Sequence, residues 1–179
     1  AAARARPDEL TYGSAGVGSI GHLATELLVA AADVRMRHVP YKGAANAAID
    51  LAGGQIQAMI SSHSTLSPFL RSGKVRALAV TSKQPHRAFP DLPPLAETVP
   101  GYVNEVWVGV FAPAGTPGRF VERMNRELNQ VSASPQLRVL LEPDGMMAVS
   151  MSPAAFAARV KEELARWRQI AASRKIVVE

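Results

Sequence analysis

The residues best suited to hold a ligand form a glycine-rich run, Gly13-Ser14-Ala15-Gly16-Val17-Gly18-Ser19. The run lies between a short predicted strand and a predicted helix, where backbone N–H groups are unpaired and the helix dipole adds partial positive charge. Glycine lets the backbone approach a ligand closely, and two serine hydroxyls add donors. The run therefore suits a carboxylate or phosphate. A plain tight turn, with Ser19 as the helix N-cap, is the alternative.

Two further polar loops also follow predicted strands. Tyr41, Lys42 and Gly43 come after Pro40, and Ser61-Ser62-His63-Ser64 follows the next strand. Ligands of parallel α/β sheets collect at the carboxyl ends of the strands, so these loops are expected beside the glycine-rich run. The alternatives are a solvated lysine after a proline-ended strand and a helix-capping serine cluster. The residues predicted to contact the ligand are Ser14, Ala15, Gly16, Val17, Gly18, Ser19, His22, Tyr41, Lys42, Gly43 and Ser62.

The same run matches a dinucleotide-binding fingerprint at Gly16, Gly18 and Gly21, with Asp33 downstream. A buried first strand of a dinucleotide-binding fold should be a longer apolar run than Leu-Thr-Tyr, so the context disfavours this interpretation. A nucleotide-dependent oxidoreductase therefore stays as an alternative, as does an assembly module that binds no small molecule. Our hypothesis is a binding protein that is not an enzyme and needs no cofactor.

Histidines and acidic residues predict no catalytic or metal site. His22, His38, His63 and His86 are expected to stand alone on separate elements. His22 and Glu26 lie one helical turn apart, which favours a surface ion pair over a metal site. No nucleophile-elbow or phosphate-loop sequence occurs.

Composition narrows the class of partner. Hydrophobic residues make up 47% of the 179 residues and charged residues 20%, which is typical of a soluble globular protein. The net charge of +5 favours anionic partners, but the basic residues are scattered, so no nucleic-acid partner is expected. No apolar run is long enough to span a membrane, and the absence of cysteine excludes disulfides. Residues 1–7 lack the apolar core of a signal peptide, so we expect a removed signal or a start inside a longer protein.

Hydrophobic periodicity predicts an α/β fold with a mostly parallel sheet. The predicted strands cover residues 10–12, 34–39, 56–60 and 75–80, and helices are predicted after Ser19 and over 44–51 and 66–71. Prolines between residues 82 and 100 indicate an extended connection. Beyond it, a strand over 103–111 and a possible one over 145–149 accompany three amphipathic helices, near residues 117–131, 135–141 and 153–171. We therefore predict an α/β ligand-binding domain over 1–102 and a helix-rich part of a second domain over 103–179.

At these loops the sequence resembles the Bug receptors, the solute-binding proteins of tripartite tricarboxylate transporters. The resemblance rests on Leu10 to Ser19 with His22-Leu23-Ala24, and on segments beginning at His38, Leu51, Gly73, Phe89 and Phe111, ending with the Trp167 helix. It implies a periplasmic-binding-protein-like fold (type II), a periplasmic location and capture of a small carboxylate for membrane transporter subunits. The loop around Ser14, Gly16, Gly18 and Ser19 would be one of two carboxylate loops.

Two departures from the family pattern matter. The family's N-terminal third, with the opposite carboxylate loop, is absent, and Ser61-Ser62 stands where many members carry an acidic-amide pair. The apolar helix stripes of 103–179 therefore have little sheet to cover, and exposing them would be unfavourable. We expect this half to be completed by another chain, as a homodimer or with an N-terminal fragment.

Overall fold

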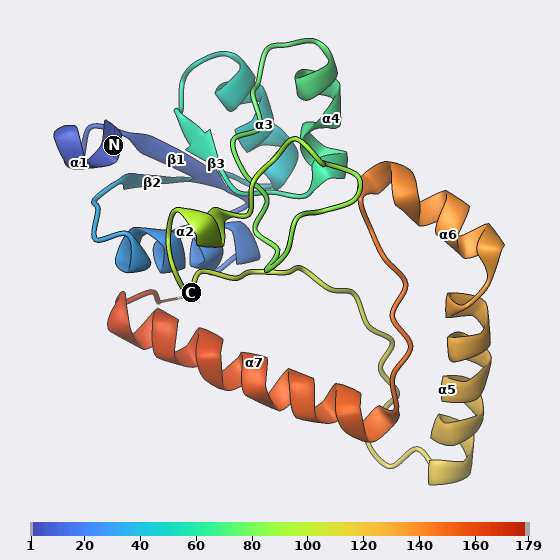
Figure 1. The fold of residues 1–179 in the computed structure, drawn as a ribbon. Coiled ribbons are helices and arrows are strands. Elements are labelled where there is room, and N and C mark those ends of the chain that lie inside the picture. The colour runs from blue at the N-terminus through green and yellow to red at the C-terminus, as the bar shows by residue number, and fades with distance from the viewer. Residues whose placement is uncertain (1, 178–179) are drawn as a thin grey trace. The chain divides into compact units, whose positions relative to one another are not determined.

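The computed structural model describes residues 2–177 and divides into two compact units (Figure 1). The first unit combines Ala1–Val106 with Trp167–Glu179, and the second is Trp107–Arg166. The last helix, α7 (Pro153–Ser173), begins in the second unit and ends in the first. The first unit therefore contains all the predicted ligand loops together with the end of the chain.

A parallel sheet organises the first unit. Its strands are β1 (Thr11–Ser14), β2 (Arg37–Pro40) and β3 (Ala58–Met59), in the order β2-β1-β3. Besides the end of α7, the helices of this unit are α1 (Ala2–Ala5), α2 (Ile20–Ala31), α3 (Ala44–Ala52), α4 (His63–Arg71) and the short η1 (Leu95–Glu97). The crossovers through α2 and α3 run in opposite directions, so right-handed connections place these helices on opposite faces (Figure 1). The predicted α/β class with a parallel sheet is confirmed.

Small residues let α3 pack closely on the sheet. Ala47 and Ala48 are fully buried on α3, and Ile56 is buried as well. A Cβ atom added to Gly13 in the middle of β1 would come 2.4 Å from Cδ1 of Ile56. Glycine at position 13 is therefore a packing requirement of this face. On the other face the core contains Tyr12, Ala24, Val29 and Tyr102, and Tyr102 donates its hydroxyl to the carbonyl of Ala24 at 3.1 Å.

The predicted strand over 75–80 is wrong over most of its length. Among the described residues, only Val80 forms a bridge there, and its partner is Pro94. A strand needs a regular partner, and the neighbouring β3 is only two residues long. The apolar run is therefore extended without a ladder, and Leu78 is 69% exposed.

The second unit is helical, with α5 (Gly118–Ser132), α6 (Pro135–Leu141), η2 (Glu142–Asp144) and the start of α7. Ser134 caps α6, since its Oγ accepts from the backbone N–H of Leu137 at 3.3 Å. The predicted strands over 103–111 and 145–149 are wrong, because these described residues form no ladder with a partner. Most of their apolar side chains are exposed, Val108 at 93%, while Val103 and Trp107 are half-buried.

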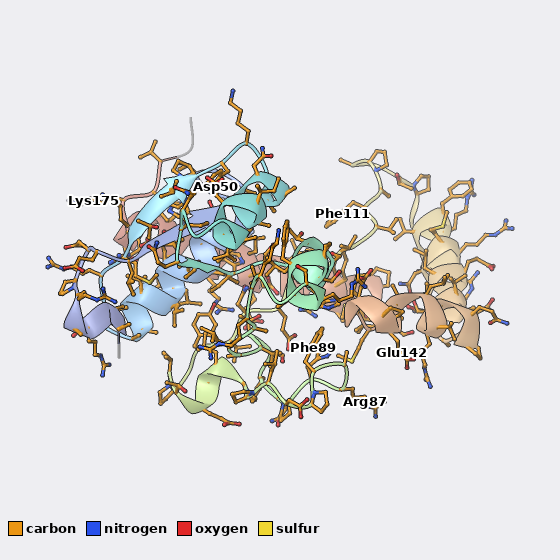
Figure 2. The ribbon with its side chains drawn as sticks, turned by 90° about the horizontal axis from the view of Figure 1, so that it is seen from above. Asp50, Arg87, Phe89, Phe111, Glu142 and Lys175 are labelled. Carbon is orange, nitrogen blue, oxygen red and sulfur yellow. The ribbon has the colours of Figure 1, made fainter. Side chains whose placement is uncertain are left out.

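An aromatic cluster joins the extended chain of the second unit to α7. Phe156 on α7 lies 5.2 Å from Trp107, edge to face, and 5.3 Å from Phe111 between ring centroids. A Cβ atom on Gly109 would come 2.3 Å from Cζ of Phe156, so glycine makes room for that ring. Phe111, labelled in Figure 2, is nevertheless 66% exposed.

Within residues 2–177 no helix combines the length and apolar character that crossing a membrane requires.

Candidate functional site

Three loops meet at the carboxyl edge of the sheet. The first, here called the glycine loop, is residues 13–19 at the end of β1; the second is residues 41–43 after β2; the third is residues 61–64 after β3. The backbone N–H of Tyr41 donates to the carbonyl of Ser14 at 3.1 Å, which joins the second loop to the end of β1. A Cβ atom on Gly16 would lie 3.3 Å from the carbonyl oxygen of Tyr41, and one on Gly21 would lie 2.9 Å from that of Ile60. The chain passes from β1 to β2 and then crosses back past β1 to β3, so the carboxyl ends of all three parallel strands lie at one edge of the sheet. Ligands of such sheets bind there.

Hydrogen bonds within the glycine loop fix its conformation. The N–H of Gly16 donates to Oγ of Ser14 at 3.2 Å, and that of Ser19 donates to the carbonyl of Gly16 at 3.2 Å. The hydroxyl of Ser19 donates to the same carbonyl at 2.7 Å. Gly16 and Gly18 have φ values of 129° and 76°, which favour glycine. Ser14 and Ser19 therefore shape the loop in this structure.

Backbone donors remain open just before α2 and in its first turn. No hydrogen bond within residues 2–177 occupies the N–H groups of Val17, Ile20 or Gly21. Ser19 stands at the N-cap position of α2, as the tight-turn alternative expects, but its side chain makes no cap bond among the described residues. Because the helix dipole is positive at this end, these N–H groups can hold an anionic group.

Two histidines expected to be isolated are stacked beside the loop. The rings of His22 and His38 lie 3.8 Å apart with an interplanar angle of 8°. His22 accepts at Nδ1 from the N–H of Gly18 at 3.1 Å, and Nε2 of His38 lies 2.7 Å from Oγ of Ser14. The prediction of four separate histidines is therefore wrong, because β2 pairs His38 with Tyr12 on the face that α2 covers. His38 was not among the predicted site residues.

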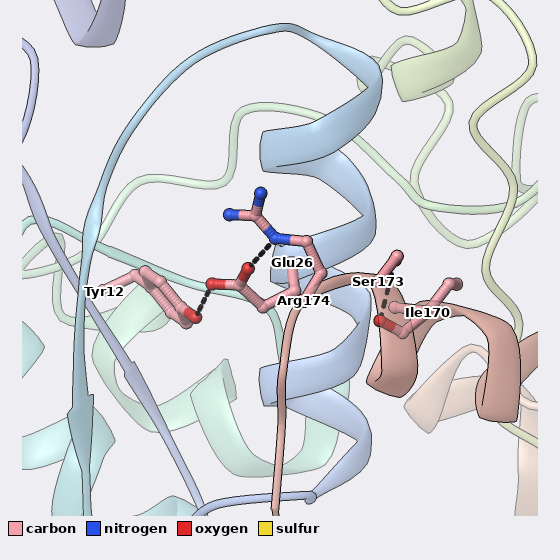
Figure 3. Close-up of polar contacts among 5 residues, drawn as sticks. All are labelled: Tyr12, Glu26, Ile170, Ser173 and Arg174. Carbon is pink, nitrogen blue, oxygen red and sulfur yellow. Dashed lines mark hydrogen bonds and ion pairs between the residues drawn. The ribbon is translucent and has the colours of Figure 1, made fainter.

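Glu26 is buried under this stack, and the predicted surface ion pair with His22 is wrong. The carboxylate of Glu26 accepts from the hydroxyl of Tyr12 at 2.5 Å and from Nε of Arg174 at 2.6 Å (Figure 3). Burial by itself would raise the pKa of Glu26, but the bonds from Tyr12 and Arg174 outweigh it and hold the pKa below its ordinary value. The pKa of Tyr12 is raised, first by burial and then by its bond to the Glu26 carboxylate.

Burial favours the neutral form of both stacked histidines. It lowers the pKa of His22 below its ordinary value, while the nearby Glu26 carboxylate works in the opposite direction. Burial also lowers the pKa of His38 to about 4, and repulsion from His22 adds to this. At neutral pH the positive potential of the loop therefore comes from backbone N–H groups and not from imidazolium.

The second and third loops have more exposed side chains. Lys42 is exposed, and the hydroxyl of Tyr41 donates to Oδ2 of Asp50 on α3 at 2.8 Å (Asp50 is labelled in Figure 2). Gly43 has a φ of 138° just before α3. Ser62 precedes α4, and its hydroxyl lies 3.0 Å from the hydroxyls of Ser64 and Thr65. Ala15 and Val17 are exposed at the tip of the first loop.

Metal-ligating residues do not gather in the part of the chain that the structure describes: residues 2–177 hold no group of three or more His, Cys, Asp or Glu side chains placed to bind a metal ion.

Comparisons with known proteins place the whole chain in one family. Residues 1–176 match the tripartite tricarboxylate transporter family receptor. A protein of Pseudomonas sp. (strain P51), named UPF0065 protein in tcbD-tcbE intergenic region, is 40% identical over 171 residues. That match covers 94% of this chain but 51% of the relative, so the chain spans about half of that relative's length.

Solved structures of similar sequence share the fold. The structure of R. palustris Rpa4515 with adipate matches with a TM-score of 0.87 at 37% identity, covering 98% of this chain and 59% of the other. The periplasmic binding protein BugD matches with a TM-score of 0.81 at 31% identity, covering 97% and 59%. The matched family is one of receptors and not of enzymes, which speaks against the oxidoreductase alternative. The chain belongs to the tripartite tricarboxylate transporter receptor family.

Proposed function

We propose that this chain binds a small carboxylate where the ends of β1, β2 and β3 meet, and that it does so as the receptor of a tripartite uptake system. The observation that carries this is the set of open N–H groups of Val17, Ile20 and Gly21 at the start of α2. A carboxylate offers two oxygens as acceptors, and bonds to a charged acceptor are stronger than neutral ones. A similar structure has adipate in its name, which supports a dicarboxylate.

In this proposal the predicted site residues have different roles. The amides of Val17, Ile20 and Gly21 bind the carboxylate, and Lys42 supplies mobile positive charge near the loop. Ser14, Gly16, Gly18, Ser19 and His22 shape the loop, as their bonds to one another support. Ala15, Tyr41, Gly43 and Ser62 border the ligand.

A proline at position 20 tests the amide contacts. Ile20 is the first residue of α2, where proline fits and only the N–H is lost. Ser19 before it already has φ −65° and ψ 157°, which a residue preceding proline adopts readily. We expect Ile20→Pro to weaken adipate binding in calorimetry about tenfold, the loss of one charge-assisted bond. Ile20→Ala keeps the N–H and should bind like the natural chain; equal affinities of all three proteins would refute the site.

The family supports a proposal for the location and the partners. We propose a periplasmic protein that delivers its ligand to membrane subunits. We further propose that residues 103–179 are part of a second domain. Additional chain would complete it, since the match to Rpa4515 covers only 59% of that protein. A homodimer or an N-terminal receptor fragment would supply that chain. Exposed Val106, Val108 and Val110 support this completion.

A further inference from the structure

We propose that His22 and His38 act as a neutral stacked pair that positions the glycine loop, and that protonation of His22 releases Gly18 and loosens the loop. For its effect on ligand binding this inference rests on the proposed carboxylate function. Its structural part stands on the free protein alone.

The proton positions follow from the bonds that the loop makes. Nδ1 of His22 accepts from the N–H of Gly18 at 3.1 Å, so Nδ1 carries no proton and the imidazole is neutral. A proton on Nδ1 would turn that acceptor into a donor facing another donor. The Gly18 bond is therefore incompatible with a charged His22.

His38 holds the other end of the loop. The hydroxyl of Ser14 donates to the carbonyl of Gly16 at 3.0 Å, and a hydroxyl has one proton to give. Nε2 of His38, 2.7 Å from the same Oγ, is then the donor in that pair. Ser14 also accepts from the N–H of Gly16 at 3.2 Å, so His38 acts on Gly16 through Ser14.

The groups packed around the stack reinforce its neutrality. The rings lie face to face at 3.8 Å, which makes two charges on them mutually repulsive. Tyr12 from β1 lies against the pair, with its ring centroid 4.9 Å from that of His38. Glu26, one turn below His22, is an anion, but Arg174 pairs with it at 2.6 Å and offsets its attraction for a proton. The lowered pKa values of both histidines agree with this geometry.

The pair thereby connects pH to the shape of the anion-binding turn. Gly16 and Gly18 hold positive φ values, and each is fixed by a bond that depends on one histidine, Gly18 directly and Gly16 through Ser14. With both bonds intact, Val17 between them and Ile20 after them keep their N–H groups open. Loss of the Gly18 bond would let the turn move and would lower affinity for a carboxylate in acid.

The test is a set of amide and imidazole NMR shifts of the free chain between pH 8 and pH 4. We expect both imidazoles to titrate below their ordinary pKa, with Nδ1 of His22 unprotonated at pH 7.5, and the Gly18 amide shift to follow the His22 titration. His22→Asn places an amide oxygen where Nδ1 lies and cannot titrate, so its Gly18 shift should stay constant with pH. His22→Leu has no acceptor, so its Gly18 amide should be displaced already at pH 7.5.

Binding of adipate at pH 7.5 gives the second measurement. We expect His22→Asn to bind within threefold of the natural chain and His22→Leu to bind at least tenfold more weakly; His38→Gln, which keeps a donor for Ser14, should resemble His22→Asn. His86→Asn is the matched control, because Nδ1 of His86 also accepts a backbone N–H, that of Ala88 at 3.2 Å, away from the loop.

The outcomes separate the two proposals. A His22 imidazole that titrates at its ordinary pKa of about 6.5, or a Gly18 amide that ignores it, would overturn the positioning role. The same holds if His22→Leu and His22→Asn bind adipate equally well. If the NMR shifts behave as expected but neither the natural chain nor any variant binds adipate, the role of the histidine pair is supported and only the proposed ligand class is contradicted. If His22→Leu does not fold, the pH series of the natural chain and His22→Asn decides alone.

Discussion

Arg174, at the end of the chain, donates from Nε to Oε2 of Glu26 at 2.6 Å, across 148 residues of sequence. Glu26 is 7% exposed, and its other oxygen accepts from Tyr12 on β1. The C-terminal end of α7 is thus tied to the helix that carries the ligand loop (Figure 3). A buried carboxylate needs such partners, because an uncompensated buried charge is strongly destabilising.

Removing Arg174 should therefore destabilise the first unit. We expect Arg174→Gln to lower the free energy of unfolding by about 2–3 kcal/mol, since it leaves the Glu26 carboxylate buried without its cation. Urea denaturation at pH 7 measures this. Adding Glu26→Gln to the Arg174→Gln variant should recover part of the lost stability, because it removes the buried negative charge. Exposed Arg168→Gln is the control, and equal stabilities of the two arginine variants would contradict the assignment.

Stability should fall in acid because of the stacked histidines. Both have folded-state pKa values below their ordinary value of 6.5, with His38 at about 4. Between the lowered pKa of the folded state and the ordinary pKa of 6.5, the unfolded chain binds more protons than the folded one, so stability decreases as the pH falls. For His38 we expect a loss on the order of 1 kcal/mol between pH 7 and pH 5, with solvent screening a partly exposed ring.

Thermal unfolding across this pH range checks the sign and the source. The double variant His22→Asn with His38→Gln should unfold with a flatter pH dependence than the natural chain, because neither replacement titrates. A natural chain equally stable at pH 7 and pH 5, or a double variant with an unchanged slope, would show that the stack is not responsible.

Glycine at position 21 should be required for the close approach of the start of α2 to the backbone at Ile60. A Cβ there would lie 2.9 Å from the carbonyl oxygen of Ile60, a backbone atom that cannot move aside alone. We expect Gly21→Ala to cost about 1–3 kcal/mol of stability and to weaken adipate binding. Gly118→Ala is the control, since its Cβ meets nothing within 4 Å and alanine favours the start of α5. Indistinguishable melting temperatures of the two variants would contradict the close approach.

Local signals in the sequence predicted the helices better than the strands. The predicted helices over 44–51 and 135–141 agree with α3 and α6 to within a residue, because Gly53 and Pro135 act on the backbone beside them. The runs 75–80 and 103–111 have strand-like composition, but a strand also requires a partner elsewhere in the chain. Composition does not show whether that partner is present.

The candidate site, too, was only partly predictable from the sequence. The glycine loop and its neighbours were predictable, because all parallel strands present their carboxyl ends at one edge. The stack of His22 on His38 was not, since it depends on the pairing of Tyr12 with His38 and on the position of α2 above them. The alternation of Tyr12 and Ser14 along β1, with His22 and Glu26 one turn apart, was a usable signal that all four side chains share one layer.

The exposed apolar chain from Val106 to Phe111 leads to the last prediction. Val106, Val108, Val110 and Phe111 are each more than 60% exposed, in a segment with no ladder partner among the described residues. Such a run of β-branched and aromatic residues forms strands readily and is unfavourable in water. We expect the chain to associate at micromolar concentration, with itself or with an added N-terminal receptor fragment.

Light scattering with size-exclusion chromatography measures this association. Substituting both Val108 and Val110 by lysine should weaken it at least tenfold, because charges on an edge prevent strand pairing. Leu78→Lys is the matched control: Leu78 is 69% exposed but lies in the first unit, so association should persist. The double lysine variant should keep the pH dependence of the histidine pair, because the first unit holds both histidines. A compact monomer of the natural chain at micromolar concentration that binds adipate tightly would show that the second unit needs no completion.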